Sequence, residues 1–173
     1  MMMDPTADPF AAPAPDADAP VERFGAKDAN DLSWANLLNA YTCTECGRCT
    51  SECPANLTGK KLSPRKIMMD TRDRIEEIGV NIAANGSFVD DGKSLLGDYI
   101  TNEELWACTS CNACVQACPV DIDPLNIIMK LRNFATMEES SAPGALNAMM
   151  TNVENNGAPW PFNQMDRANW INE

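Results

Sequence analysis

Two short stretches hold all eight cysteines of the chain, and both follow the same spacing. The first reads CTECGRCTSECP and covers residues 43–54, and the second reads CTSCNACVQACP and covers residues 108–119. Each is a C-x2-C-x2-C-x3-C run followed by a proline. Four thiols so close in sequence lie in one tight loop, and thiolates are strong metal ligands. Any fold of this chain therefore has to accommodate two cysteine loops that can bind metal.

The absence of histidine excludes several kinds of site. A Ser-His-Asp triad, a Cys–His nucleophile pair, a mixed Cys/His zinc finger, a Rieske centre and a bis-histidine haem all require it. The commonest general acid–base group of enzymes is missing as well. If the protein takes part in catalysis, a bound metal must carry the chemistry.

The charge balance narrows the partners and the location. Lys and Arg together number 13 against 25 Asp and Glu, which gives a formal net charge of −12. Such an acidic chain is unsuited to gripping phosphate backbones, so we expect no nucleic-acid partner. Because the sequence has no long apolar run and no signal peptide, we expect no direct membrane insertion. The expected location is the cytoplasm, where reduced thiols favour metal binding over disulfides.

The sequence around the two runs repeats as well, and predicts a duplicated unit of helix, cysteine loop and helix. Before the first run, with Asp31 or Ser33 as candidate cap, four apolar residues fall near a helical period: Leu32, Leu37, Leu38 and Tyr41. Thr101 and Glu104 form a capping-box pattern before the second run. After the runs, SPRKIMMDTR (63–72) and DPLNIIMKLR (123–132) both place a proline directly after a capping residue, which is typical of a helix start.

Composition divides the chain into three segments. Residues 1–30 are rich in Pro and Asp, and we expect a disordered or extended tail because they cannot bury enough apolar surface. Residues 31–142 hold the duplicated unit, with a loop-rich connector predicted from Gly79 onward. Residues 143–173 predict a helix that opens near Pro143 and closes at Gly157, then a short helix after Asn163. The aromatic side chains of this last segment predict a surface that docks on a partner.

The full cysteine run predicts two [4Fe–4S] clusters. In two-cluster ferredoxins three thiolates of one run bind one cluster, and the fourth binds the other. We therefore expect two ligand sets, Cys43, Cys46, Cys49 and Cys118 for the first cluster, and Cys108, Cys111, Cys114 and Cys53 for the second. A pair of all-cysteine zinc sites is the alternative, although such sites normally show separated C-x-x-C pairs.

The residues between the thiols suit a loop wrapped around a cluster. Gly47 and Asn112 follow the second cysteine of each run, and both residue types accept left-handed backbone geometry. Pro54 and Pro119 turn the chain away after the last cysteine without adding an N–H donor. We expect these four residues, together with Arg48, to form the cluster-binding loops.

The two loops differ in charge. Arg48 lies inside the first loop, where the second has Ala113, and positive charge favours the reduced form of a cluster. Arg48 therefore predicts the higher reduction potential for the cluster held by the first loop. Six basic residues also lie between Lys60 and Arg74. This basic run fits a solvated helix face and a docking patch for an acidic partner equally well.

Three longer stretches carry a resemblance to a known family: CTECGRCTSECPANLTGKKLSPRKIMMDTRD, LWACTSCNACVQACPVDIDPLNIIMKLR and the closing ENNGAPW. They resemble the dicluster ferredoxin module of heterodisulfide-reductase-related proteins. That group includes the heterodisulfide reductase C subunit, the glycerol-3-phosphate dehydrogenase C subunit, and membrane oxidoreductases in which the module is fused to CCG domains. The resemblance covers about residues 31–173 and implies a mainly α fold, an α-helical ferredoxin with two [4Fe–4S] clusters.

The resemblance also implies a function. It indicates an electron-transfer iron–sulfur subunit, no enzyme on its own, in a heterodisulfide-reductase-like complex that is membrane-associated and quinone-linked. Its partners would be a CCG-domain or haem-binding membrane oxidoreductase and a flavoprotein electron donor, which would hold it at the inner face of the membrane. All eight cysteines belong to the two runs, so we expect a separate partner to supply CCG repeats. The alternative is a free-standing soluble dicluster ferredoxin.

Overall fold

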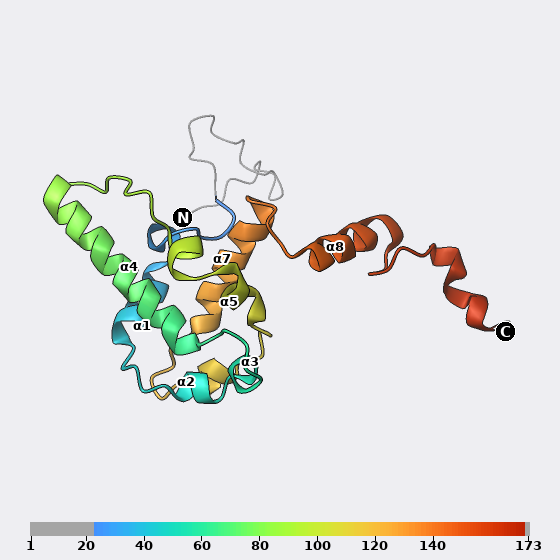
Figure 1. Ribbon diagram of the computed structural model, residues 1–173, viewed down its shortest axis with the longest axis horizontal. Helices are drawn as coiled ribbons and strands as arrows, with labels where there is room; N and C mark the ends of the chain where they lie inside the picture. Colours follow the sequence, from blue (N-terminus) through green and yellow to red (C-terminus); the bar gives the residue numbers. More distant parts are fainter. Residues whose placement is uncertain (1–22, 172–173) are drawn as a thin grey trace, which may run out of the picture.

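Each cysteine run lies between two helices in the computed structural model, which describes residues 23–171 (Figure 1). These residues contain no β-strand, as the mainly α prediction requires. The elements in chain order are η1 (Ala29–Asp31), α1 (Trp34–Thr42), α2 (Arg48–Ser51), α3 (Pro54–Leu57), α4 (Pro64–Asn85), η2 (Leu95–Tyr99), α5 (Asn102–Ala107), α6 (Ala113–Gln116), α7 (Pro124–Met137), α8 (Gly144–Asn156) and η3 (Gln164–Ile171). Throughout this part of the chain, every helix is too short or too polar to cross a bilayer.

The long helices begin at the capping residues that the sequence predicts. Ser33 and Ser63 accept hydrogen bonds from backbone N–H groups in the first turns of α1 and α4. Asp123 does the same for α7, and Thr101 and Glu104 form a reciprocal capping box at α5. Because each cap satisfies N–H groups that the helix itself leaves free, the duplicated helix–loop–helix unit is fixed locally.

Helices α4 and α7 are the equivalent long helices of the two units, and they pack against each other in the core (Figure 1). Ile67 and Met68 of α4 and Ile127 and Ile128 of α7 are fully buried. Burying an aliphatic side chain of this size contributes about 1.5–3 kcal/mol. The two repeats are therefore held together by a shared apolar core directly behind the cysteine loops.

Helix α1 turns a different face to the core from the one its period suggests. Leu38 and Tyr41 are each 52% exposed and Trp34 is 77% exposed, whereas Asn36 and Ala40 are buried. Asn36 Nδ2 donates a hydrogen bond of 3.1 Å to the side-chain oxygen of an asparagine in α7, which satisfies a buried polar group. The exposed residues are spaced at i, i+4 and i+7, which is the helical period that the sequence predicts. They form an apolar stripe of α1 that faces solvent instead of the core.

Helix α4 is longer than predicted. A loop was expected from Gly79, but the helix continues to Asn85 and ends at Gly86, whose φ of 77° is the left-handed value of a C-terminal cap. A single glycine within a helix costs only about 1 kcal/mol relative to alanine, so Gly79 does not end it. The connector between the two units therefore begins at Gly86.

Residues 1–22 of the predicted tail lie outside the described part of the chain, and residues 23–30 pack against the rest of the fold. Ala26 is buried and its backbone N–H donates to the carbonyl of Lys130 in α7 at 3.1 Å. Asp28 caps η1 and also accepts hydrogen bonds from Arg74 and from the backbone N–H of Leu95. Asp28 thus anchors this segment to the buried Arg74. The composition of residues 1–30 does not predict such a contact.

Arg74 is the most buried charged residue of the described chain, with a side chain that is 0% exposed. It lies between Asp28 at 2.7 Å and Asp91 at 2.6 Å, and it also donates to the backbone carbonyl of Lys93. Hydrogen bonds from Arg74 lower the pKa of Asp91 to about 2, from an ordinary value of 3.8. Because this pKa is depressed, the contact stabilises the fold above about pH 4 and weakens as the pH falls toward 2.

The basic run from Lys60 to Arg74 is not one solvated helix face. Besides the buried Arg74, three of its members pair with carboxylates of the chain: Lys61 with Glu103, Lys66 with Asp70 and Glu104, and Arg72 with Glu45. Most of its charge is therefore compensated within the fold. Lys60 and Arg65 form no ion pair within residues 23–171.

The C-terminal segment projects from the rest of the molecule (Figure 1). Helix α8 starts after Pro143 and is closed by Gly157 in left-handed geometry, and η3 follows Asn163, as the sequence predicts. No residue of α8 is buried, and Trp160, Phe162 and Trp170 are 49%, 65% and 74% exposed. We call residues 143–171 the C-terminal arm.

We predict that Arg74→Met lowers the free energy of unfolding by about 3–5 kcal/mol, because it leaves two partly buried carboxylates without their cation. Urea denaturation of anaerobically prepared protein, followed by circular dichroism, measures this change. Arg167→Met, which removes an exposed arginine of η3, is the matched control. Equal denaturation midpoints for the two variants would contradict the role given to Arg74.

We also predict that Gly25→Ala destabilises the protein by about 1–3 kcal/mol more than Gly86→Ala. Both glycines have positive φ, 89° and 77°, so the backbone strain is shared. A Cβ at Gly25 would collide with the carbonyl oxygen of Lys130 and lie 2.6 Å from the backbone nitrogen of Phe134, whereas one at Gly86 meets nothing within 4 Å. A smaller loss for Gly25→Ala in the same urea assay would show that residues 23–30 do not depend on this contact.

Candidate metal centres

The structure forms two cavities, and each is lined by cysteines of both runs. The first cavity is lined by Cys43, Cys46, Cys49 and Cys118, and the second by Cys108, Cys111, Cys114 and Cys53. The last cysteine of each run thus lies in the cavity of the other run. The structure thus gathers the thiols into the two expected groups, and their role as cluster ligands stays a prediction.

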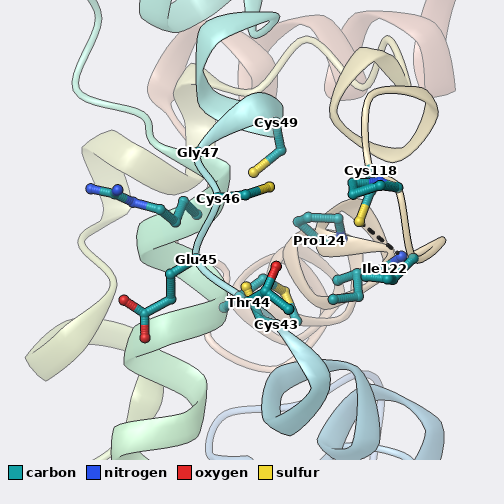
Figure 2. Close-up of a pocket in the computed structure, with 13 residues that line it drawn as sticks. Cys43, Thr44, Glu45, Cys46, Gly47, Cys49, Cys118, Ile122 and Pro124 are labelled. Carbon is teal, nitrogen blue, oxygen red and sulfur yellow. Dashed lines mark hydrogen bonds between the residues drawn. The ribbon is translucent and has the colours of Figure 1, made fainter.

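Figure 2 shows the first cavity. The sulfurs of Cys46, Cys49 and Cys118 face the space between the first loop and the Cys118 segment, while the carboxylate of Glu45 points away from them. The backbone N–H of Ile122 donates to the Sγ of Cys118 at 3.3 Å. Such a donor stabilises negative charge on a thiolate sulfur.

The two loops use the same backbone turn. Gly47 and Asn112 have φ of 80° and 61°, the left-handed geometry expected for them. Glu45 and Ser110, the second residue after the first cysteine of each run, are left-handed as well, with φ of 57° and 55°. Sequence reasoning missed this second pair because Glu and Ser have no special preference for that region. The shared turn directs the first three cysteines of each run into the cavity of their own loop.

An arginine of the following helix holds each of these turns. In the first unit Arg72 forms an ion pair of 2.6 Å with Glu45. In the second unit the equivalent Arg132 donates to Ser110 Oγ at 3.2 Å and to the Cys108 carbonyl at 2.6 Å. It also lies over the ring of Trp106 at 5.0 Å. The two arginines correspond in sequence, and each fixes the strained residue of its own cysteine loop.

The remaining walls are mostly apolar, and each unit contributes wall residues to the cavity of the other. Each cavity takes two long-helix residues from its own unit, and one of the two is apolar at an equivalent position, Met68 in the first and Ile128 in the second. From the other unit the first cavity takes Ile122 and Pro124, and the second takes Leu62 and Pro64. These walls cover the more buried thiols and lower the dielectric around them, so electrostatic interactions there are strengthened.

Among the predicted loop residues, four lie at the cavities and one does not. Gly47 and Pro119 line the first cavity, and Asn112 and Pro54 line the second. Arg48 lines neither cavity: its exposed side chain lies in a shallow hollow between α2 and α6. The arginine in the wall of the first cavity is Arg65 instead.

Burial disfavours a free thiolate at two of the cysteines. It raises the pKa of Cys49, and it raises the pKa of Cys114 to about 11 with a further contribution from the charge of Cys108. Cys111 is the exception, since the Ala113 backbone N–H and the Thr109 hydroxyl lower its pKa. So many thiolates gathered in two apolar cavities require bound cations to offset their charge.

The arrangement of these donors fits an iron–sulfur cluster better than a zinc ion. Within residues 23–171, no three Cys, Asp or Glu side chains converge closely enough to hold a single metal ion. Tetrahedral zinc needs four donors at about 2.3 Å from one point. Four thiols spread around a mostly apolar cavity, with the carboxylate of Glu45 pointing away from the sulfurs, suit a larger [4Fe–4S] cluster, for which cysteine thiolates are the usual ligands.

Comparisons with known proteins agree with this geometry. Residues 42–122 match the family described as a 4Fe-4S dicluster domain. The chain is 34% identical to the probable iron-sulfur-binding oxidoreductase FadF of Bacillus subtilis, over 88% of this chain and 26% of that protein. It is 32% identical to the EtfAB:quinone oxidoreductase of Syntrophomonas wolfei, over 88% of this chain and 24% of that protein.

A shorter relative shares the cysteine domain. It is the heterodisulfide reductase C subunit of Methanosarcina acetivorans, which is 34% identical over 63% of this chain and 54% of that protein. The chain spans about a quarter of the length of the two longer relatives. Residues 42–122 of the chain therefore form a domain of the 4Fe-4S dicluster family, and the homologues of the chain are FadF-like iron–sulfur oxidoreductases and heterodisulfide reductase C subunits.

Proposed function

We propose that this iron–sulfur electron-transfer protein relays single electrons through two [4Fe–4S] clusters within a heterodisulfide-reductase-like, quinone-linked oxidoreductase complex. The crossed placement of Cys53 and Cys118 carries the proposal, because it puts two all-thiol cavities side by side in one rigid core. When bound, each cluster takes up and releases one electron. The chain contributes ligands and an apolar surround but no histidine acid–base group, so we infer that it is no enzyme on its own.

In this proposal Cys43, Cys46, Cys49 and Cys118 bind the first cluster, and Cys108, Cys111, Cys114 and Cys53 bind the second. The left-handed residues Gly47 and Asn112 let the loops wrap around the clusters, and Pro54 and Pro119 turn the chain away after the fourth ligand. The apolar walls lower the dielectric around the more buried thiols. The two long helices fix the distance between the cavities.

The crossed ligand sets make a specific prediction. Cys118→Ser and Cys46→Ser should change the same EPR signal of the dithionite-reduced protein, and Cys53→Ser and Cys111→Ser should change the other. The wild type, prepared anaerobically, should contain about eight iron atoms and eight sulfides per chain, as two cubane clusters require. Bound zinc in place of iron would contradict the cofactor, and pairing of Cys118 with Cys111 would contradict the crossing.

We propose that the partner is a CCG-domain or haem-binding membrane oxidoreductase, with a flavoprotein as electron donor. Two relatives support this by name, one as an EtfAB:quinone oxidoreductase and one as a probable membrane-anchored ferredoxin of Chromohalobacter salexigens. The matched region is about a quarter of each of these relatives, so each of them carries further chain beside it. The chain would then lie at the inner face of the membrane through its partner.

The C-terminal arm is the surface we propose for this contact. Its three large aromatic side chains are each at least 49% exposed, and such groups are enriched where proteins bind one another. A free-standing ferredoxin, the alternative function, has no need of an exposed aromatic arm. The net charge of −12 favours that alternative, because it keeps a small carrier soluble.

We predict that Trp160→Ala combined with Trp170→Ala abolishes partner recovery in a mild affinity purification from the source cells, while both clusters stay intact. Val80→Ala, which changes an exposed apolar residue at the far end of α4, should recover the partner normally. A b-type haem spectrum or a CCG sequence in the recovered material identifies the partner. Recovery of the wild-type chain alone would favour the free-standing carrier.

A further inference from the structure

The wall of the first cavity contains a charge that the second cavity lacks. Arg65 and Leu125 occupy equivalent positions, each directly after the helix-starting proline of its unit. Arg65 lines the first cavity and Leu125 lines the second. At this one matching position the duplicated unit has exchanged a guanidinium for an apolar side chain.

Arg65 is held close to the first loop. Its Nη1 lies 3.8 Å from the position that a Cβ atom on Gly47 would occupy, inside the turn between Cys46 and Cys49. Its backbone N–H donates to Thr50 Oγ1 at 3.3 Å, and that hydroxyl is bonded to Ser63 Oγ at 2.8 Å. The start of α4 is thus tied to α2, which keeps the guanidinium beside the loop.

The charge of Arg65 is not compensated by the described residues. It forms no ion pair within residues 23–171, and it differs in this from Arg72, whose charge is balanced by Glu45 at 2.6 Å. Glu45 also lines the first cavity, so Arg72 and Glu45 together add little net charge there. The second cavity has Arg132 behind its loop, bonded to the carbonyls of Leu105 and Cys108, but no cation in its wall.

We propose that Arg65, and not Arg48, raises the reduction potential of the cluster in the first cavity. The cluster in the second cavity lacks this effect, because the uncharged Leu125 occupies the equivalent position. The inference rests on the proposed function, since it needs a cluster in each cavity. An added electron makes a cluster more negative, and a nearby guanidinium lowers the energy of that reduced state. Because Arg65 is exposed at the rim, dissolved salt screens part of its effect.

Site-resolved redox titration followed by EPR tests this proposal. Arg65→Leu should lower the midpoint of the first cluster alone, by roughly tenfold in the reduced-to-oxidised ratio or about 59 mV for one electron. The reciprocal Leu125→Arg should raise the midpoint of the second cluster alone. Arg65→Lys keeps the charge and should stay near wild type, and raising the salt concentration should narrow the difference between wild type and Arg65→Leu.

Arg48→Leu is the matched comparison, because Arg48 lies within the first cysteine run, is also exposed and also forms no ion pair within residues 23–171. It should shift the first midpoint less than Arg65→Leu does. An equal or larger shift for Arg48→Leu would overturn the assignment to Arg65. An equal shift for Arg65→Lys and Arg65→Leu would show a packing effect rather than a charge effect, and would overturn it too.

Iron and sulfide content separates this inference from the proposed function. If Arg65→Leu retains about eight iron atoms per chain and two EPR signals with unchanged midpoints, the clusters stand and the role of Arg65 is refuted. If the wild type holds no pair of clusters, the proposed function fails first. Cys46→Ser and Cys111→Ser assign the two signals to their cavities before the titrations are compared.

Discussion

The exchange of the fourth cysteine between the two units is the constraint on which the rest of the structure depends. Cys53 leaves the first loop for the second cavity, and Cys118 makes the opposite crossing. Neither cavity has four thiols unless both units are folded and docked. The apolar contact of α4 with α7 positions the loops, and burial of the thiols makes bound cations necessary to their charge balance. Folding, docking and metal binding are therefore one coupled event.

Most of the secondary structure and the grouping of thiols could be predicted from the sequence because both are local. Caps and prolines mark the helix starts within a few residues, and the spacing of each run fixes a turn. What escaped prediction depends on distant partners. The segment at Ala26 is ordered by a carbonyl of α7, and the buried face of α1 is chosen by a side chain 90 residues away. Arg65 stands 16 residues after Cys49 and is brought to the loop only by the fold.

Although the chain is acidic overall, arginines form the main polar contacts between distant parts of the fold. Arg72 and Arg132 hold the two cysteine turns, and Arg74 joins the N-terminal segment to the connector between the units. A planar guanidinium offers five donors in a fixed geometry, so one side chain can satisfy several carbonyls or carboxylates at once. The net charge of the chain therefore describes its solvent-facing surface. It does not predict the electrostatic field at the thiols, which depends on the arginines nearest to them.

The exchanged walls have a consequence for the origin of the duplication. Each unit supplies three of the four thiols of one cavity. It supplies its fourth thiol to the other cavity, together with an isoleucine or leucine and a proline. Two identical copies related by a twofold axis would complete each other, because each would supply what the other lacks. An ancestral half-length peptide could thus have assembled as a symmetric homodimer, and gene fusion would then have freed its halves to diverge.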